Sequence, residues 1–95
     1  MNCHNLTFSR HALTQMFVRA ISTSEVAAAV KSGEVIEIYP DDKPFPCVLS
    51  MASNGSKVLH VVVAQETTNK NCVIVTAYEP DPNLWDTDFK RKQKK

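Results

Sequence analysis

The sequence predicts one α+β domain in which two helices precede a mainly antiparallel sheet of four strands. Three observations carry this prediction. Two segments with helical spacing of apolar residues come first, four strand-like segments follow, and the connectors between the strands favour hairpins. A length of 95 residues, a 43% apolar fraction and two glycines are typical of a single globular domain. We place the domain at residues 1–89 and a basic tail at residues 90–95.

The first predicted helix spans residues 10–19. Ser9 or Thr7 can cap its first turn. The apolar residues that recur there at helical spacing are Leu13, Met16, Phe17 and Ala20. His11 lies near the helix start at the border of the buried face, where it is either a packed core residue or a catalytic group.

The second predicted helix spans residues 23–32. Ser22 and Glu25 have the spacing of a capping box, in which the serine accepts from the backbone and the glutamate reaches back. Gly33 follows the helix and tolerates the left-handed conformation that ends many helices.

Four segments have strand-like composition. Three prolines in PDDKPFP, after the first of them, cannot donate ladder hydrogen bonds. Asn54-Gly55 is a strong hairpin signal because both residues tolerate positive φ. We therefore predict sequential antiparallel strands at residues 34–39, 47–52, 57–64 and 72–78.

Cysteine usage and hydropathy indicate a cytoplasmic protein. Cys3, Cys47 and Cys72 are odd in number and far apart, which fits reduced thiols better than a disulfide framework. No apolar run approaches the ~20 residues that span a bilayer, and MNCHNLTFSR has no apolar stretch suited to a signal peptide. We expect no membrane contact.

Neither a metal nor a cofactor is expected. Cys3, His4 and His11 are conceivable metal ligands, but they lack a recognised ligand spacing. A chain this short buries only roughly 60 to 70% of its unfolded surface, so a large cofactor cavity would consume its core. A surface cleft is the expected kind of site.

The net charge of +1 conceals a division along the chain. Residues 1–89 carry six basic and ten acidic residues, a net charge of −4. Charges clustered at a terminus form either a solvated tail or a site that attracts a polyanion. The basic residues of the tail are Lys90, Arg91, Lys92, Lys94 and Lys95.

Strand pairing predicts a polar cluster on one face of the sheet. A turn centred near residue 68 sets His60 opposite Thr76 and Val58 opposite Tyr78. A two-residue turn at Asn54-Gly55 sets Leu49 beside His60. His60, Thr76 and Tyr78 then form either a site or a group of ordinary strand residues.

The end of the domain carries two aromatic residues, Trp85 and Phe89, at a spacing of four. This spacing predicts a short helix that its aromatic side chains anchor on the body. A stacking platform for RNA is the alternative.

Several segments together resemble the family known as domain of unknown function 4258, whose members look like relatives of RelE and BrnT toxins. The resemblance runs from about Phe8 to Lys92. The sequence departs from the family pattern at Gln15, where Arg is usual, and at Ala20, where Gly is common. The segments are SRHALTQMFVRAIS, VAAAVKSGEVIEIYPDD, LHVVVA and IVTAYEPDPNLWDTDFKRK.

This resemblance implies a RelE-like fold and a small intracellular ribonuclease toxin that is held inactive by a cognate antitoxin. In related toxins the ribose 2′-hydroxyl attacks the adjacent phosphate without a metal. Such a reaction needs a base, an acid and positive charge, and histidine titrates near neutral pH. The candidate catalytic residues are His11 and His60 as the acid/base pair, Arg19 at the phosphate, and Thr76 and Tyr78 as donors.

Binding of RNA is expected to involve Arg10, Lys90, Arg91 and Lys92 through phosphate contacts. For Arg19, the alternative is a solvated residue at a helix C-terminus, where the helix dipole favours a cation. For the whole chain, the alternative is a non-catalytic module that binds a protein or nucleic-acid partner. The sequence leaves the oligomeric state open.

Overall fold

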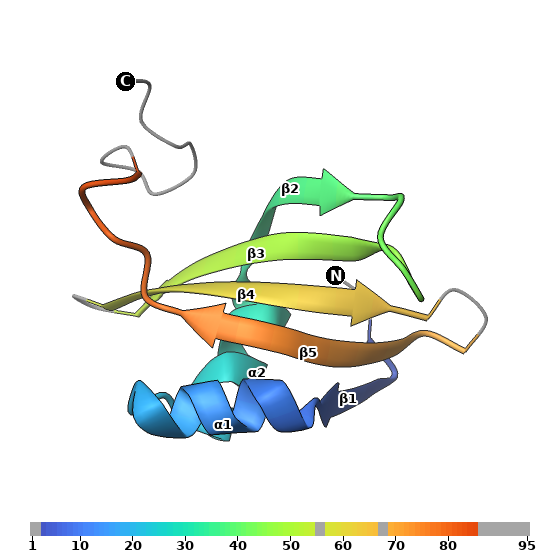
Figure 1. The fold of residues 1–95 in the computed structure, drawn as a ribbon, viewed down its shortest axis with the longest axis horizontal. Coiled ribbons are helices and arrows are strands. Elements are labelled where there is room, and N and C mark those ends of the chain that lie inside the picture. Colours follow the sequence, from blue (N-terminus) through green and yellow to red (C-terminus); the bar gives the residue numbers. More distant parts are fainter. Residues whose placement is uncertain (1–2, 55–56, 67–68, 86–95) are drawn as a thin grey trace.

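The computed structural model describes residues 3–54, 57–66 and 69–85 (Figure 1). The strands form one sheet in the order β1-β5-β4-β3-β2. β1 runs parallel to β5, and every other neighbouring pair is antiparallel. In chain order the elements are β1 (Asn5–Phe8), α1 (Arg10–Val18), α2 (Thr23–Ser32), β2 (Glu34–Tyr39), β3 (Cys47–Asn54), β4 (Lys57–Gln65) and β5 (Asn71–Tyr78).

The prediction of a four-stranded antiparallel sheet is wrong, because the sheet has five strands and is mixed. The fifth strand is β1, which precedes both helices and pairs along its whole length with the first half of β5. Asn5 and its partner Asn71 are 66 residues apart in the sequence. A strand of four residues shows too little alternation to be recognised, and local patterns do not reveal pairing between distant segments.

The helix starts follow the predicted capping. The Ser9 side chain accepts from the backbone N–H of Ala12 at the start of α1. At the start of α2, Ser22 accepts from the N–H of Glu25, and the Glu25 carboxylate accepts from the N–H of Ser22. These bonds satisfy donors that an α-helix leaves unpaired in its first turn.

The helix ends differ from the prediction. Gly33 is extended, with φ −77° and ψ 170°, rather than left-handed. A Cβ at this position would meet the Ala29 carbonyl oxygen and would lie 2.7 Å from Ser50 Oγ. Gly33 therefore permits close packing of α2 on β3.

The left-handed residue is Ala20, with φ 56°, directly after α1. Its N–H donates to the carbonyl of Phe17, and the N–H of Ile21 donates to the carbonyl of Met16. This pair of bonds is the Schellman motif, in which glycine is the usual left-handed residue. Ile21 and Met16 are both buried, which adds the apolar contact that accompanies the motif.

The main core lies between the helices and one face of the sheet. α1 packs on β5, and α2 packs on β3 and β4 (Figure 1). Its buried members are Ala12, Met16, Ile21, Val26, Ala29, Val30, Leu59, Val61, Val63, Cys72, Ile74 and Ala77.

A second buried group lies outside this core. Cys47 pairs with Ala64 and Leu49 with Val62, so these side chains share the face that His60 occupies. Cys47, Leu49, Ala64 and His60 are all buried. Both faces of the sheet centre are therefore covered.

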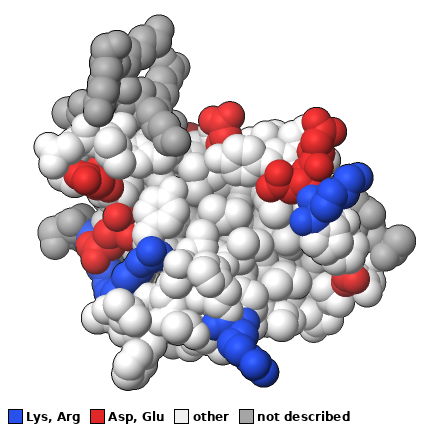
Figure 2. All heavy atoms as spheres, in the orientation of Figure 1, with Lys and Arg blue, Asp and Glu red and all other residues white. Residues whose placement is uncertain are grey.

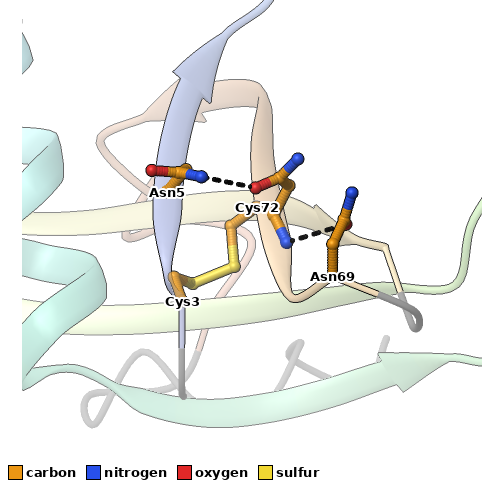
Figure 3. Close-up of a disulfide and its surroundings, with 5 residues drawn as sticks. Cys3, Asn5, Asn69 and Cys72 are labelled. Atoms are coloured by element: carbon orange, nitrogen blue, oxygen red, sulfur yellow. Dashed lines mark hydrogen bonds between the residues drawn. A yellow bond between two sulfur atoms is a disulfide. The ribbon is translucent and has the colours of Figure 1, made fainter.

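A disulfide joins Cys3 to Cys72, across a sequence separation of 69 (Figure 3). The expectation of three reduced thiols is therefore wrong, and only Cys47 is a free, buried thiol. The pairing of β1 with β5, which was not predicted, brings the two Cα atoms to 5.6 Å. Beside the disulfide, the Asn5 amide donates to the Asn71 side chain at 2.9 Å.

Among the described residues, no helix is long and apolar enough to cross a membrane.

Candidate functional site

The edge of β5 that faces away from β4 contacts two different elements along its length. β1 pairs with β5 as far as Phe8 and Ile74, after which α1 lies against the strand. Two side chains then bond to the edge. Ser9 Oγ donates to the Val75 carbonyl at 3.4 Å, and Arg19 Nη1 donates to the Ala77 carbonyl at 2.9 Å. Polar side chains from the two ends of α1 thus take the place of a neighbouring strand.

A bulge in β5 determines which side chains share a face. Val62 pairs with Thr76 and Val63 with Ile74, so the register skips Val75. The bulge puts Ile74 on the helix side of the sheet and Thr76 on the opposite side. Without it, both side chains would point the same way.

The predicted register between β4 and β5 is wrong, in part because of this bulge. His60 pairs with Tyr78, not with Thr76, and Thr76 pairs with Val62. On its other side His60 pairs with Met51 rather than Leu49, because the β3–β4 hairpin closes with Asn54 opposite Lys57. The turn residues 55–56 lie outside the described part of the chain. The cluster of His60, Thr76 and Tyr78 survives because the three still share one face.

His60 is fully buried, at 0% exposure, beneath two aromatic residues. Its ring meets the Trp85 ring edge-on, with the centroids 4.4 Å apart, and the Tyr78 ring at 5.4 Å. His60 Nδ1 lies 3.4 Å from the Tyr78 hydroxyl oxygen. The imidazole is therefore shielded from solvent, and its Nδ1 lies beside the Tyr78 hydroxyl.

A surface groove of about 620 Å³ lies over this cluster, where α1 and β5 end. Basic and acidic atoms meet on this side of the molecule (Figure 2). The groove is lined by Arg19, Tyr78, Glu79, Asp81, Leu84 and Trp85.

Tyr78 is a hydrogen-bond donor at neutral pH. Burial raises the pKa of its hydroxyl, and the negative charge that Tyr39 can develop raises it further, while the Arg19 guanidinium opposes the shift. A phenol with a raised pKa keeps its proton at neutral pH. The side chain suits donation to an oxygen rather than proton abstraction.

Gln15 joins the helix to the sheet beside the groove. Its Oε1 accepts from Thr76 Oγ1 and, at 3.3 Å, from Arg19 Nη1. The amide thus bridges the threonine and the guanidinium. Both hydrogen bonds that the Arg19 side chain donates to described residues leave from Nη1, so Nη2 has no protein acceptor in the described part of the chain.

The other predicted site residues lie elsewhere. Arg10 and His11 are exposed in the first turn of α1, and neither lines the groove. His11 is eight residues before Arg19, or about 12 Å along the helix axis, whereas His60 lies beside Tyr78, which lines the groove together with Arg19. The structure therefore does not bring the two predicted imidazoles together. Lys90, Arg91 and Lys92 lie outside the described residues.

Glu79 and Asp81 line the groove although the sequence did not single them out as site residues, and Trp85, named there as an anchor or a stacking residue, lines it too. They follow Tyr78 in the segment TAYEPD-x-x-x-W, and their proximity to it was a usable signal. Trp85 lies in a turn that begins at Asp81, and its backbone N–H donates to the Asp81 carbonyl at 3.2 Å. The predicted helix through Phe89 extends beyond the described residues, but Trp85 does anchor on the body, with 8% exposure.

No group of three or more metal-binding side chains gathers within the described ranges. Cys3 has no thiolate to offer a metal, since it forms the disulfide.

Comparison with known proteins gives one match. No curated protein and no solved structure matches the chain. A family model described as Domain of unknown function matches residues 8–79, a range that includes β5 with Tyr78 and Glu79. The chain therefore belongs to the family Domain of unknown function (DUF4258).

Proposed function

We propose that the chain is a metal-independent endoribonuclease of the RelE-like kind that acts in the cytoplasm as the toxin of a toxin–antitoxin pair. One observation carries the proposal. A cation, a protonated phenol and a carboxylate line the same groove, namely Arg19, Tyr78 and Glu79. These are the three kinds of group that cleavage of RNA by its own 2′-hydroxyl requires.

In the proposed reaction, the Glu79 carboxylate takes the proton of a ribose 2′-hydroxyl. The 2′-oxygen forms a bond to the adjacent phosphorus, and the bond from phosphorus to the 5′-oxygen breaks. Tyr78 donates a proton to that leaving oxygen. The products are a 2′,3′-cyclic phosphate and a 5′-hydroxyl, and the proton on Glu79 returns to Tyr78 through solvent.

Arg19 neutralises the charge that develops on the phosphate, because a guanidinium presents parallel donors matched to phosphate oxygens. Among the described residues, Ala77 and Gln15 accept hydrogen bonds from its Nη1, and Nη2 is offered to a ligand. Gln15 thus orients the Arg19 guanidinium. The family usually has a second arginine at the position of Gln15.

His60 is a positioning residue in this scheme. Its Nδ1 faces the Tyr78 hydroxyl at 3.4 Å, and Trp85 packs against its ring. A buried imidazole there holds the phenol in one orientation. His11 lies outside the groove, so the proton transfers are assigned to groove residues.

The test is cleavage of a single-stranded RNA by the purified chain in excess EDTA. We expect fragments that end in cyclic phosphate. Tyr78→Phe and Arg19→Ala should each lower the rate by about 100-fold or more, as removal of a transition-state donor does. Lys31→Ala is a matched control outside the groove and should cleave like the original chain.

Intact RNA after long incubation, cleavage that EDTA abolishes, or full activity of Tyr78→Phe would each contradict the ribonuclease proposal. The toxin part has its own test. Expression should arrest growth, Tyr78→Phe should not, and co-expression of the protein encoded next to this chain should restore growth. Arrest that Tyr78→Phe leaves unchanged would contradict it.

The second candidate is a non-catalytic module for a protein or nucleic-acid partner. Glu79 and Asp81 favour it, because two carboxylates in the groove repel an RNA phosphate. Binding of RNA or of a protein without any cleavage would select this function.

A further inference from the structure

The outer side of α1 exposes large apolar side chains. Phe17 is 88% exposed and Val18 is 78% exposed, and Leu13 beside them is partly exposed. Exposed apolar side chains that cluster in this way mark interaction sites more often than scattered single ones. Phe17 is the most exposed large apolar residue in the described part of the chain.

The helix that carries Phe17 has basic residues and no acidic ones. α1 carries Arg10, and Arg19 caps its C-terminal end, while no carboxylate lies between them. The edge of the molecule that α1 forms shows basic and uncharged atoms but no acidic ones (Figure 2). Arg10 and Phe17 are seven residues apart, so they lie on one stripe of the helix, about 10 Å apart along its axis.

Another exposed apolar side chain lies in the opposite electrostatic setting. Ile38 on the edge strand β2 is 63% exposed and follows Glu37, and Asp41 and Asp42 come shortly after the strand. A polyanion is repelled there and attracted to α1. The basic helix with its exposed phenyl ring fits a ligand that combines phosphates with flat apolar faces, which is single-stranded nucleic acid.

We propose that the outer side of α1 binds single-stranded RNA on its way to the groove, with the Phe17 ring stacked on an unpaired base and Arg10 bound to a nearby phosphate. This inference rests on the proposed function. The position of the groove supports it, since Arg19 lines the groove at the same end of α1 as Phe17.

The experiment measures binding of a 2′-O-methylated single-stranded oligonucleotide, which cannot be cleaved, to the full chain by fluorescence anisotropy. Phe17→Ala should raise Kd at least about five-fold, the loss of one stacked base. Phe17→Trp should keep the affinity, and Phe17→Leu should lose it, because leucine retains apolar bulk but has no aromatic face. Arg10→Ala should lower the slope of log Kd against log salt by about one.

Ile38→Ala is the matched control and should leave Kd unchanged. Thermal unfolding of each variant separates binding from stability, and a side chain as exposed as Phe17 should not change it. A Phe17→Leu variant that binds RNA as well as the original chain would overturn the stacking assignment.

The outcomes also separate this inference from the proposed function. If the chain cleaves RNA and Phe17→Ala binds and cleaves equally well, the inference fails alone. If the original chain neither binds nor cleaves RNA, both fail. If Phe17→Ala keeps its RNA affinity but escapes neutralisation by the adjacent gene product, the surface binds a protein instead, and the inference is overturned.

Discussion

The two halves of β5 are fixed to the body by different kinds of bond. Residues 71–74 pair with β1 through the backbone, and the Cys3–Cys72 disulfide joins the two strands. Residues 75–78 have α1 beside them, and side chains of Ser9 and Arg19 bond to their carbonyls.

The two kinds of bond place different demands on the amino-acid sequence. Backbone pairing accepts almost any side chain, whereas capping a carbonyl from a helix needs a donor of suitable length at a particular position. The second half therefore requires specific polar residues from α1. Arg19, which caps Ala77, also lines the groove with Tyr78.

Opening the disulfide should have the largest effect on this comparison, because it removes the covalent link of the first half. Closure of a loop with a separation of 69 residues stabilises a fold by about 4.4 kcal/mol in the chain-entropy model. We expect urea unfolding in a reductant to show a free energy of unfolding lower by about that amount.

Cys3→Ser provides the control, since its stability should not respond to reductant. An unchanged midpoint for the original chain in reductant would show that the backbone ladder alone holds β1.

Ser9→Ala tests the second half with a smaller effect. Ser9 caps α1 and also donates to the Val75 carbonyl, so its loss should cost about 2 kcal/mol of unfolding free energy. Ser22→Ala removes the equivalent cap of α2, which has no bond to the sheet in the described residues, and should cost about 1 kcal/mol. Equal losses in the two variants would mean that the contact with Val75 contributes nothing.

Local patterns predicted most elements of this fold. The helix at residues 23–32 and the strand at residues 34–39 have the expected bounds, because a capping box and an apolar run are local signals. The sequence did not predict β1 because its partner strand lies near the other end of the sequence. Because the pairing of β1 with β5 was not predicted, the disulfide between Cys3 and Cys72 was not predicted either. One non-local contact therefore accounts for both errors.

The sequence predicted the part of the candidate site that consists of titratable and cationic residues, and only the structure shows the rest. His60, Tyr78 and Arg19 stood out as titratable or cationic groups, and they do lie together at the end of β5. The bulge at Val75 shifts the pairing by one residue, and no turn signal in the sequence specifies it. Glu79 was missed because a carboxylate after a strand usually belongs to a solvated connector.

Ala20→Gly tests the end of α1, from which Arg19 reaches the Ala77 carbonyl. Ala20 has φ 56°, a conformation that costs an L-residue roughly 1 to 2 kcal/mol and that glycine adopts freely. After allowance for the greater freedom of glycine in the unfolded chain, we expect the free energy of unfolding to rise by about 1 kcal/mol. Ala28→Gly, at an exposed position inside α2, should lower it by about the same amount, because there glycine only loses helix propensity. Urea unfolding of both variants measures the two changes, and a loss of stability in Ala20→Gly would show that α1 does not end in a left-handed residue.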